Sequence, residues 1–176
     1  SEMCIRDRTI CEGDTPAMLE ADVAPVFEGG AVPSYQWMQS LDGVTFTDIG
    51  GATADTYTPG ALTQDTWFRL SVTSTMGTND CTEETNDVRI YVINFDPGSI
   101  NTDQTICENT APAPFTSVAP TGDGSFTFQW ESSPDNATWT PIAGATGATY
   151  AAPALSADTY FRREVTASLN GTDCIE

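Results

Sequence analysis

The sequence predicts an all-β protein built from two tandem β-sandwich domains, and three observations support this class. The 176-residue chain contains one pattern twice. Apolar and polar residues alternate in short runs rich in β-branched and aromatic side chains, as in residues 34–37 and 126–130. Turn signals recur at short spacing, and no window favours a helix of about ten residues or more.

The repeat is defined by residues that return at a constant spacing. Three aromatic residues recur with a partner 93 positions later: Trp37 with Trp130, Tyr57 with Tyr150, and Phe68 with Phe161. Cys81 and Cys174 keep this spacing, whereas Cys11 and Cys107 are 96 positions apart, so the first repeat has three extra residues before its tryptophan. We expect the six aromatic residues to lie in two equivalent cores.

Each repeat has room for about seven short strands, which is typical of an immunoglobulin-like Greek-key sandwich. Residues 88–95 alternate as the last strand of the first repeat, and Pro97 and Gly98 end it. The second repeat has no counterpart of this strand, so we expect it to be truncated at its C-terminus and to lack its last strand. The simplest explanation is that the sequence is a fragment of a longer array of repeats. The predicted domains are residues 9–96 and 97–176. Residues 1–8, with the unmatched Cys4, are expected to be a non-native or disordered head.

The strand at residues 68–72 fixes which side chains point inward. Phe68, Leu70 and Val72 alternate with polar residues, so they are expected inside and Arg69 outside. Phe161 and Val165 keep this phase in the second repeat, with Arg162 outside. We expect both arginines to form surface ion pairs with neighbouring acids.

The charge and the missing residue types exclude several functions. Twenty-five acidic residues against six arginines give a net charge of −19, which disfavours nucleic acid and anionic membranes as partners. Histidine and lysine are absent, which excludes a Ser-His-Asp triad, an imidazole metal ligand, a Schiff base and a P-loop. No apolar stretch approaches the length of a membrane span. We therefore expect a protein that is not an enzyme and does not insert directly into a membrane.

Four short motifs occur in both halves: an aromatic-Gln-Trp strand, a Ser-x-Asp turn, a Gly-Ala-Thr turn and an Asp-Thr-aromatic-Phe-Arg strand. The second half also has a Tyr-x-x-Pro-x-Leu segment. Over residues 9–176 these motifs resemble the immunoglobulin-like, PKD-like repeats of Bacteroidota cell-surface adhesins and gliding-associated proteins exported by type IX secretion. The resemblance implies an extracellular or bacterial cell-surface location. It also implies a structural or adhesive role as a spacer or binding module, with neighbouring repeats of the same chain as partners.

The cysteines recur with the repeat, which favours one disulfide per domain: Cys11–Cys81 and Cys107–Cys174. One difficulty follows from the expected strand order. It places the first cysteine near the start of the sandwich and the second in a late hairpin, at opposite ends, whereas a disulfide needs Cα atoms within roughly 7 Å. Either the strand assignment or the pairing is wrong.

Three further hypotheses concern ligands. Trp67 and Trp139 are candidates for stacking on sugars, as in a carbohydrate-binding accessory module of a secreted enzyme. Asp96 and Asp103 are candidates for binding calcium at the junction, although no Asp-x-Asp-x-Asp-Gly loop is present, and no other cofactor is expected. The absent last strand allows a third alternative, a filament subunit that a neighbouring molecule completes by donor-strand exchange.

Overall fold

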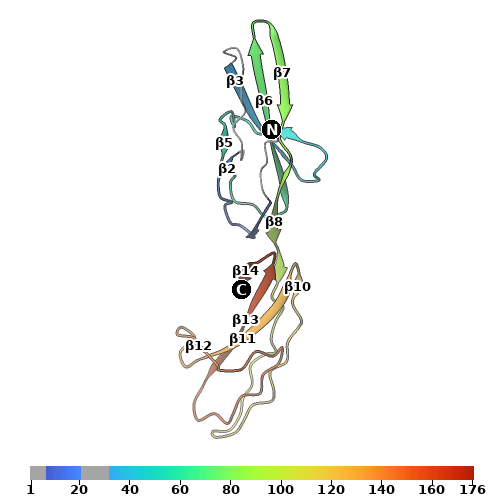
Figure 1. Ribbon diagram of the computed structural model, residues 1–176. Helices are drawn as coiled ribbons and strands as arrows, with labels where there is room; N and C mark the ends of the chain where they lie inside the picture. The colour runs from blue at the N-terminus through green and yellow to red at the C-terminus, as the bar shows by residue number, and fades with distance from the viewer. Residues whose placement is uncertain (1–6, 21–31) are drawn as a thin grey trace. The chain divides into compact units, whose positions relative to one another are not determined.

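The computed structural model describes residues 7–20 and 32–176. The chain divides into two compact units, Ser1–Val92 and Ile93–Glu176. Both are all-β immunoglobulin-like sandwiches, as predicted (Figure 1). Within the described ranges no helix has the length and apolar character needed to cross a membrane.

Most of the predicted head, including Cys4, falls outside the described residues. Its last two residues belong to unit 1. Arg8 begins the first strand, and the Asp7 carboxylate accepts a hydrogen bond from the backbone N–H of Arg89 at 2.8 Å. The folded unit therefore begins before residue 9, because these two residues are tied to a strand far away in the sequence.

The main sheet of unit 1 has the strand order β1-β8-β6-β3-β4, and β7 pairs with a second stretch of β6. The strands are β1 (Arg8–Cys11), β3 (Val32–Ser40), β4 (Thr47–Asp48), β6 (Thr66–Met76), β7 (Asn79–Glu84) and β8 (Val88–Ile93). A second sheet contains β2 (Leu19–Glu20) and β5 (Thr56–Tyr57). Strand β8 confirms the predicted last strand of the first repeat.

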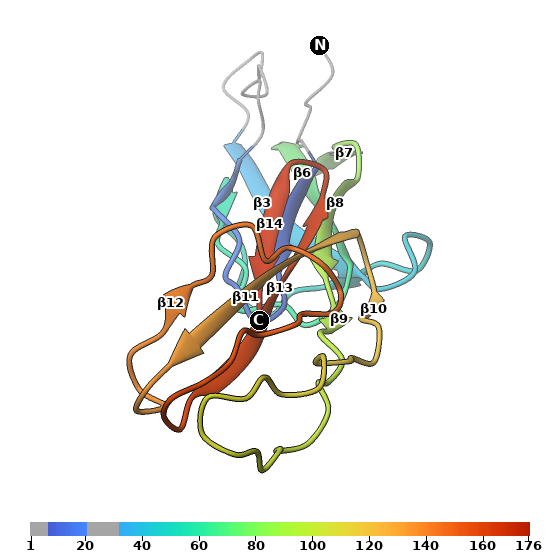
Figure 2. The same ribbon diagram turned by 90° about the horizontal axis from the view of Figure 1, so that it is seen from below.

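The main sheet of unit 2 has the order β12-β11-β13-β14, and a short pair, β9 with β10, lies outside it. Figure 2 shows β11, β13 and β14 side by side. The strands are β9 (Phe95–Asp96), β10 (Thr121–Gly122), β11 (Ser125–Ser133), β12 (Thr140–Pro141), β13 (Tyr160–Leu169) and β14 (Thr172–Ile175). Residues 97–120 run as an irregular loop with isolated bridges, including one between Phe115 and Tyr150.

Each unit has a core around one tryptophan. Trp37 and Trp130 are fully buried, and each core packs a tyrosine and a phenylalanine from matching positions around its tryptophan: Tyr57 and Phe68 in unit 1, Tyr150 and Phe161 in unit 2. These are the six residues that the repeat predicts as core. The opposing layer of each unit adds one large apolar side chain, Leu19 in unit 1 and Phe115 in unit 2.

The predicted outward arginines form ion pairs. Arg69 contacts Glu84 at 2.6 Å and Asp87 at 2.8 Å, and its pKa is raised, chiefly by the hydrogen bond to Asp87. Arg162 contacts Glu131 at 2.6 Å. The two pairs of Arg69 are partly exposed, and such pairs are usually worth less than about 1 kcal/mol each. Glu131, the partner of Arg162, is buried at 6% exposure.

The predicted disulfide between Cys11 and Cys81 is wrong. Cys81 is a free, exposed cysteine on β7, opposite Ser74 of β6. Cys11 ends β1, which lies beside β8, and β8 pairs with residues 66–68 of β6. The two cysteines are therefore separated by roughly 20 Å along the sheet, at about 3.4 Å per residue from position 68 to 74. A disulfide cannot span this distance.

The predicted disulfide between Cys107 and Cys174 is wrong for the same reason. Cys107 is free and exposed, in the turn before Thr110, while Cys174 lies on β14 opposite Ala167 of β13. Cys107 lines the same pocket as Tyr160 at the start of β13, and Tyr160 is roughly 24 Å from position 167 along the strand. Cys11 and Cys174 are disulfide-bonded cysteines. The prediction that the chain contains disulfide-bonded cysteines is therefore confirmed, whereas both predicted pairings are wrong.

Candidate functional site

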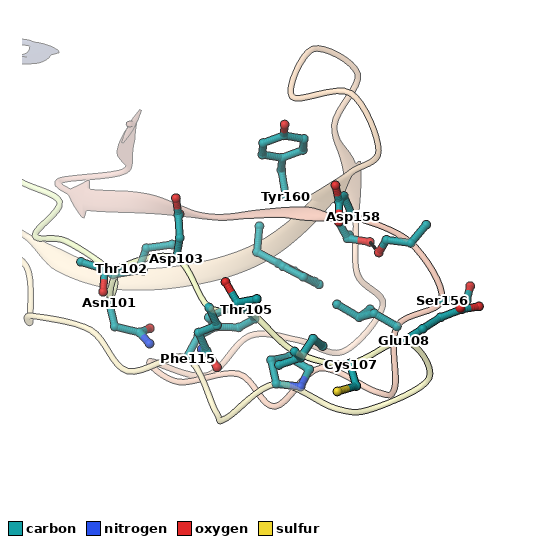
Figure 3. Close-up of a pocket in the computed structure, with 18 residues that line it drawn as sticks. Asn101, Thr102, Asp103, Thr105, Cys107, Glu108, Phe115, Ser156, Asp158 and Tyr160 are labelled. Carbon is teal, nitrogen blue, oxygen red and sulfur yellow. Dashed lines mark hydrogen bonds between the residues drawn. The ribbon is translucent and has the colours of Figure 1, made fainter.

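Unit 2 has a groove of about 540 Å³ beside the first residues of β13. One wall is the segment 100–108, and the other is the segment 155–161 (Figure 3). Phe115, which is 9% exposed, also lines the groove. Carboxylates from both walls surround it: Asp103, Glu108 and Asp158.

The same place in unit 1 is occupied by β8. The spacing of 96 matches β1 with residues 104–107, and the spacing of 93 matches residues 66–68 of β6 with residues 159–161 of β13. In unit 1, β8 lies between β1 and β6 and pairs with residues 66–68. The groove of unit 2 is therefore the equivalent of the β8 position.

One edge of β13 is open beside this groove. Strand β11 pairs along the whole of β13, whereas β14 pairs only with residues 166–169. Within the described chain, no strand pairs with residues 160–162 on the side away from β11. Side chains at this end of the strand are correspondingly less covered than in unit 1: Phe68 is 1% exposed, whereas its counterpart Phe161 is only partly buried.

Two aspartates hold β8 in unit 1. Asp7 accepts the backbone N–H of Arg89 at 2.8 Å. Asp65 accepts the backbone N–H of Val92 at 2.7 Å and forms an ion pair with the Arg89 guanidinium, which raises the pKa of Arg89. These carboxylates flank β8, so they bind both its backbone and its arginine.

Both aspartates have counterparts in the groove of unit 2. The spacing of 96 matches Asp7 with Asp103, and the spacing of 93 matches Asp65 with Asp158. Asp103 and Asp158 are exposed and line opposite walls of the groove (Figure 3). The groove thus retains the two carboxylate positions that fix a strand in unit 1.

An aromatic position is also retained. In unit 1 the Arg89 guanidinium carbon lies 4.7 Å from the centre of the Trp67 ring and 4.1 Å from that of Tyr91. The counterpart of Trp67 is Tyr160, which lines the groove and is 47% exposed. Asp158 was not among the predicted site residues, although its match to Asp65 at the spacing of 93 could have identified it.

The two tryptophans proposed to stack on sugars lie beneath arginines. Arg89 covers Trp67, and Arg162 lies with its guanidinium carbon 4.5 Å from the centre of the Trp139 ring. Both tryptophans are half-buried. Each therefore has one ring face in a cation–π contact within its own unit, and sugar binding by these residues stays a prediction.

The two aspartates proposed to bind calcium have separate environments. Asp96 accepts the backbone N–H of Gly98 at 2.7 Å and so caps a tight turn, whereas Asp103 lies in the groove. Over residues 7–20 and 32–176, no three Cys, Asp or Glu side chains are arranged to hold a metal ion. Calcium binding stays a prediction.

Comparisons with known proteins identify the module but no activity. The family model described as "Domain of unknown function (DUF8696)" matches residues 3–94 and again residues 96–175. No curated protein matches the chain. The N-terminal four Ig domains of Dscam1 isoform 6.9 share 12% identity at a TM-score of 0.40, over 97% of this chain and 42% of that one. The amphioxus IgVJ-C2 molecule shares 14% identity at a TM-score of 0.36, over 96% of each chain.

Proposed function

Because the chain belongs to the family described as Domain of unknown function (DUF8696), which matches it twice in succession, we propose that it is a non-enzymatic structural and adhesive repeat region of a secreted or cell-surface protein. Two features support this role. Each unit has its own tryptophan-centred core, as expected of modules that act as spacers. Cys11 and Cys174 are disulfide-bonded, which fits an oxidising extracellular compartment.

A bacterial surface adhesin of the Bacteroidota type is the setting that the sequence motifs favour, and it belongs to this proposal. The strongly acidic composition, with a net charge of −19, suits a protein that stays soluble outside the cell. Sugar binding at Trp67 and Trp139 is the alternative. We favour the structural role because arginines already contact both tryptophan rings.

The alternative role, a filament subunit completed by donor-strand exchange, is the one that concerns the groove of unit 2. An open strand edge exposes backbone N–H and C=O groups that can pair with another extended segment. The adjacent walls, from segments 100–108 and 155–161, supply apolar contacts and carboxylates. Together they favour binding by strand addition, in which backbone hydrogen bonds give affinity and alternate side-chain contacts give specificity. If the added strand comes from a second molecule, the same contact builds a filament.

A synthetic peptide with the sequence of residues 87–96, which contains β8, tests this mechanism on the full chain. We expect the peptide to bind and to slow amide hydrogen exchange at residues 159–163, while exchange in the core of unit 1 stays unchanged. The matched control peptide carries Val88→Asp and Ile90→Asp and should not bind, because those two side chains are fully buried in unit 1. No protection of β13 at millimolar peptide would exclude strand addition at this edge.

A further inference from the structure

We propose that Cys81 and Cys107 are the sites of disulfides between copies of the repeat, in which Cys81 of one chain bonds to Cys107 of a second copy of this chain. This inference rests on the proposed structural role and names a covalent bond that links repeats. Its failure would leave that role standing, because the role depends on the separate core of each unit.

Each cysteine position of the repeat is disulfide-bonded in one unit and free in the other. At the first position, Cys11 is bonded and its counterpart Cys107 is free. At the second position, Cys174 is bonded and its counterpart Cys81 is free. Since one cysteine of each position is bonded, the pattern favours disulfides between unlike positions.

The two cysteine positions of one unit cannot bond to each other. Roughly 20 Å or more of sheet separates them in each unit, at about 3.4 Å per residue. A disulfide needs Cα atoms within roughly 7 Å. A partner for either free cysteine therefore has to come from another copy of the repeat.

The turn at Cys107 has the geometry of the turn at Cys11. The carbonyl oxygen of Cys11 accepts the backbone N–H of Asp14 at 3.1 Å. The carbonyl oxygen of Cys107 accepts the backbone N–H of Thr110, also at 3.1 Å. Cys11 is half-buried, whereas Cys107 is exposed. The free cysteine is thus held in the same turn as its bonded counterpart, and it lies more open to solvent.

The hairpin at Cys81 matches the hairpin at Cys174. Cys81 lies opposite Ser74 of β6, and Cys174 lies opposite the equivalent Ala167 of β13. The aspartate before each cysteine accepts a hydroxyl hydrogen bond, at 2.7 Å in unit 1 and at 2.6 Å in unit 2. The bonded Cys174 is 5% exposed, whereas the free Cys81 is exposed. At both positions, therefore, the free copy has the local structure of the bonded copy but is less covered.

The proposed bond forms by two thiol–disulfide exchanges, with a small disulfide such as oxidised glutathione as the oxidant. The thiolate of one cysteine attacks a sulfur of the oxidant, which forms a mixed disulfide and releases one reduced thiol. The thiolate of the second cysteine attacks the protein sulfur of this mixed disulfide and releases the other reduced thiol. The two protein thiols lose two protons and two electrons, and the oxidant gains both.

The experiment compares two variants of the full chain, Cys81→Ser and Cys107→Ser. Both carry Cys4→Ser, so that only the cysteines of the repeat are compared. Each variant alone and an equal mixture of the two are incubated with oxidised glutathione. The chains repel each other at a net charge of −19, so the buffer contains about 1 M salt, at which the Debye length is about 3 Å.

We expect a disulfide-linked dimer in the mixture and only monomer in each variant alone, on non-reducing electrophoresis. The mixture supplies Cys107 on one chain and Cys81 on the other, whereas each variant alone supplies only one kind of free cysteine. Peptide mapping by mass spectrometry should find the bond between Cys81 and Cys107 of different chains.

Three outcomes are distinguishable. Dimer that forms only in the mixture supports the inference. Equal amounts of dimer in the mixture and in each variant alone would overturn it, because exposed thiols would then react without regard to their position. Absence of dimer from the mixture would also overturn it, provided that iodoacetamide still modifies the remaining free cysteine. Both replaced cysteines are exposed, and unchanged amide exchange in the two cores will show that the variants are folded.

Discussion

The hydroxyl of Ser133 donates a hydrogen bond to the carboxylate of Asp135 across 2.9 Å, and the same carboxylate oxygen accepts the backbone N–H groups of Thr138 at 2.8 Å and Ala137 at 2.9 Å. These bonds favour the charged form and lower the pKa of Asp135 to about 2, with Thr138 and Ala137 as the main causes. Unit 1 repeats the arrangement with Asp42 and Ser40, and the pKa of Asp42 is lowered in the same way.

The first prediction concerns acid stability. Because the folded pKa of Asp135 lies below its ordinary value of 3.8, the unfolded chain binds more protons between these values. The stabilising contribution should be complete above about pH 4 and should be lost as the pH falls toward 2. NMR titration of the side-chain carboxyl carbon measures this directly. The variant Ser133→Ala should raise the pKa partway, and a pKa of Asp135 near 3.8 in the wild-type chain would contradict the structure.

The second prediction concerns the tryptophan hydrogen bonds. The indole N–H of Trp130 donates to the carbonyl oxygen of Gly147 at 2.9 Å, as Trp37 donates to Ala54 at 3.1 Å. Trp130→Phe removes this donor and leaves a cavity in a core site, so we expect a loss of about 2–4 kcal/mol in the unfolding free energy of unit 2. Chemical denaturation, monitored by amide hydrogen exchange in each unit, measures this unfolding free energy. Trp37→Phe is the matched variant and should weaken unit 1 instead.

The third prediction concerns thiol reactivity. Cys81 and Cys107 are free and exposed, whereas Cys11 and Cys174 are disulfide-bonded. Iodoacetamide added to the native chain without reductant should modify Cys81 and Cys107 and leave the other two unmodified. Peptide mapping by mass spectrometry reads out each position. Modification of Cys11 or Cys174 in the unreduced chain would show that the observed oxidation pattern is wrong.

The fourth prediction concerns a close backbone approach in unit 2. Gly122 has a φ of 120°, and a Cβ at this position would lie 2.4 Å from the carbonyl oxygen of Asn94. Gly122→Ala should therefore destabilise unit 2 by more than the roughly 1 kcal/mol typical of a glycine with positive φ. Gly144→Ala is the control, because Gly144 has a φ of 76° and no atoms within 4 Å of its Cβ position. Equal melting temperatures for the two variants would contradict the close approach.

The repeat predicts the cores and the strand phase, since Trp37, Phe68 and their partners recur at one spacing and packing constrains both copies alike. It does not predict the cysteine pairing. Cys11 cannot reach Cys81 because β7 and β8 pair with different stretches of the long strand β6. The spacing of residues in the sequence does not predict which stretch each strand pairs with. The sequence did not predict the groove residue Asp158 either. Its counterpart Asp65 binds the backbone and the arginine of β8, and this role is known only from the position of β8 in the structure.

The last prediction concerns Arg163, which occupies in β13 the position of the buried Leu70 in β6. Burial lowers the pKa of Arg163. Its guanidinium donates to the carbonyl oxygens of Pro97 at 2.6 Å and Val118 at 3.3 Å, and it lies 4.8 Å from the centre of the Phe128 ring. The arginine thus ties the irregular loop of unit 2 to its main sheet.

Replacing Arg163 by leucine, the residue found in unit 1, should cost about 1–3 kcal/mol, because both carbonyl oxygens lose a charged donor. Arg163→Lys keeps the charge and should lose less. Chemical denaturation of unit 2 measures the effect, and amide hydrogen exchange at residues 98–99 and 117–119 shows whether the loop detaches first. A leucine variant as stable as the wild type would mean that the desolvation cost of the buried guanidinium cancels its hydrogen bonds. The loop would then be held mainly by Phe115, which lies in the loop and pairs with Tyr150 outside it.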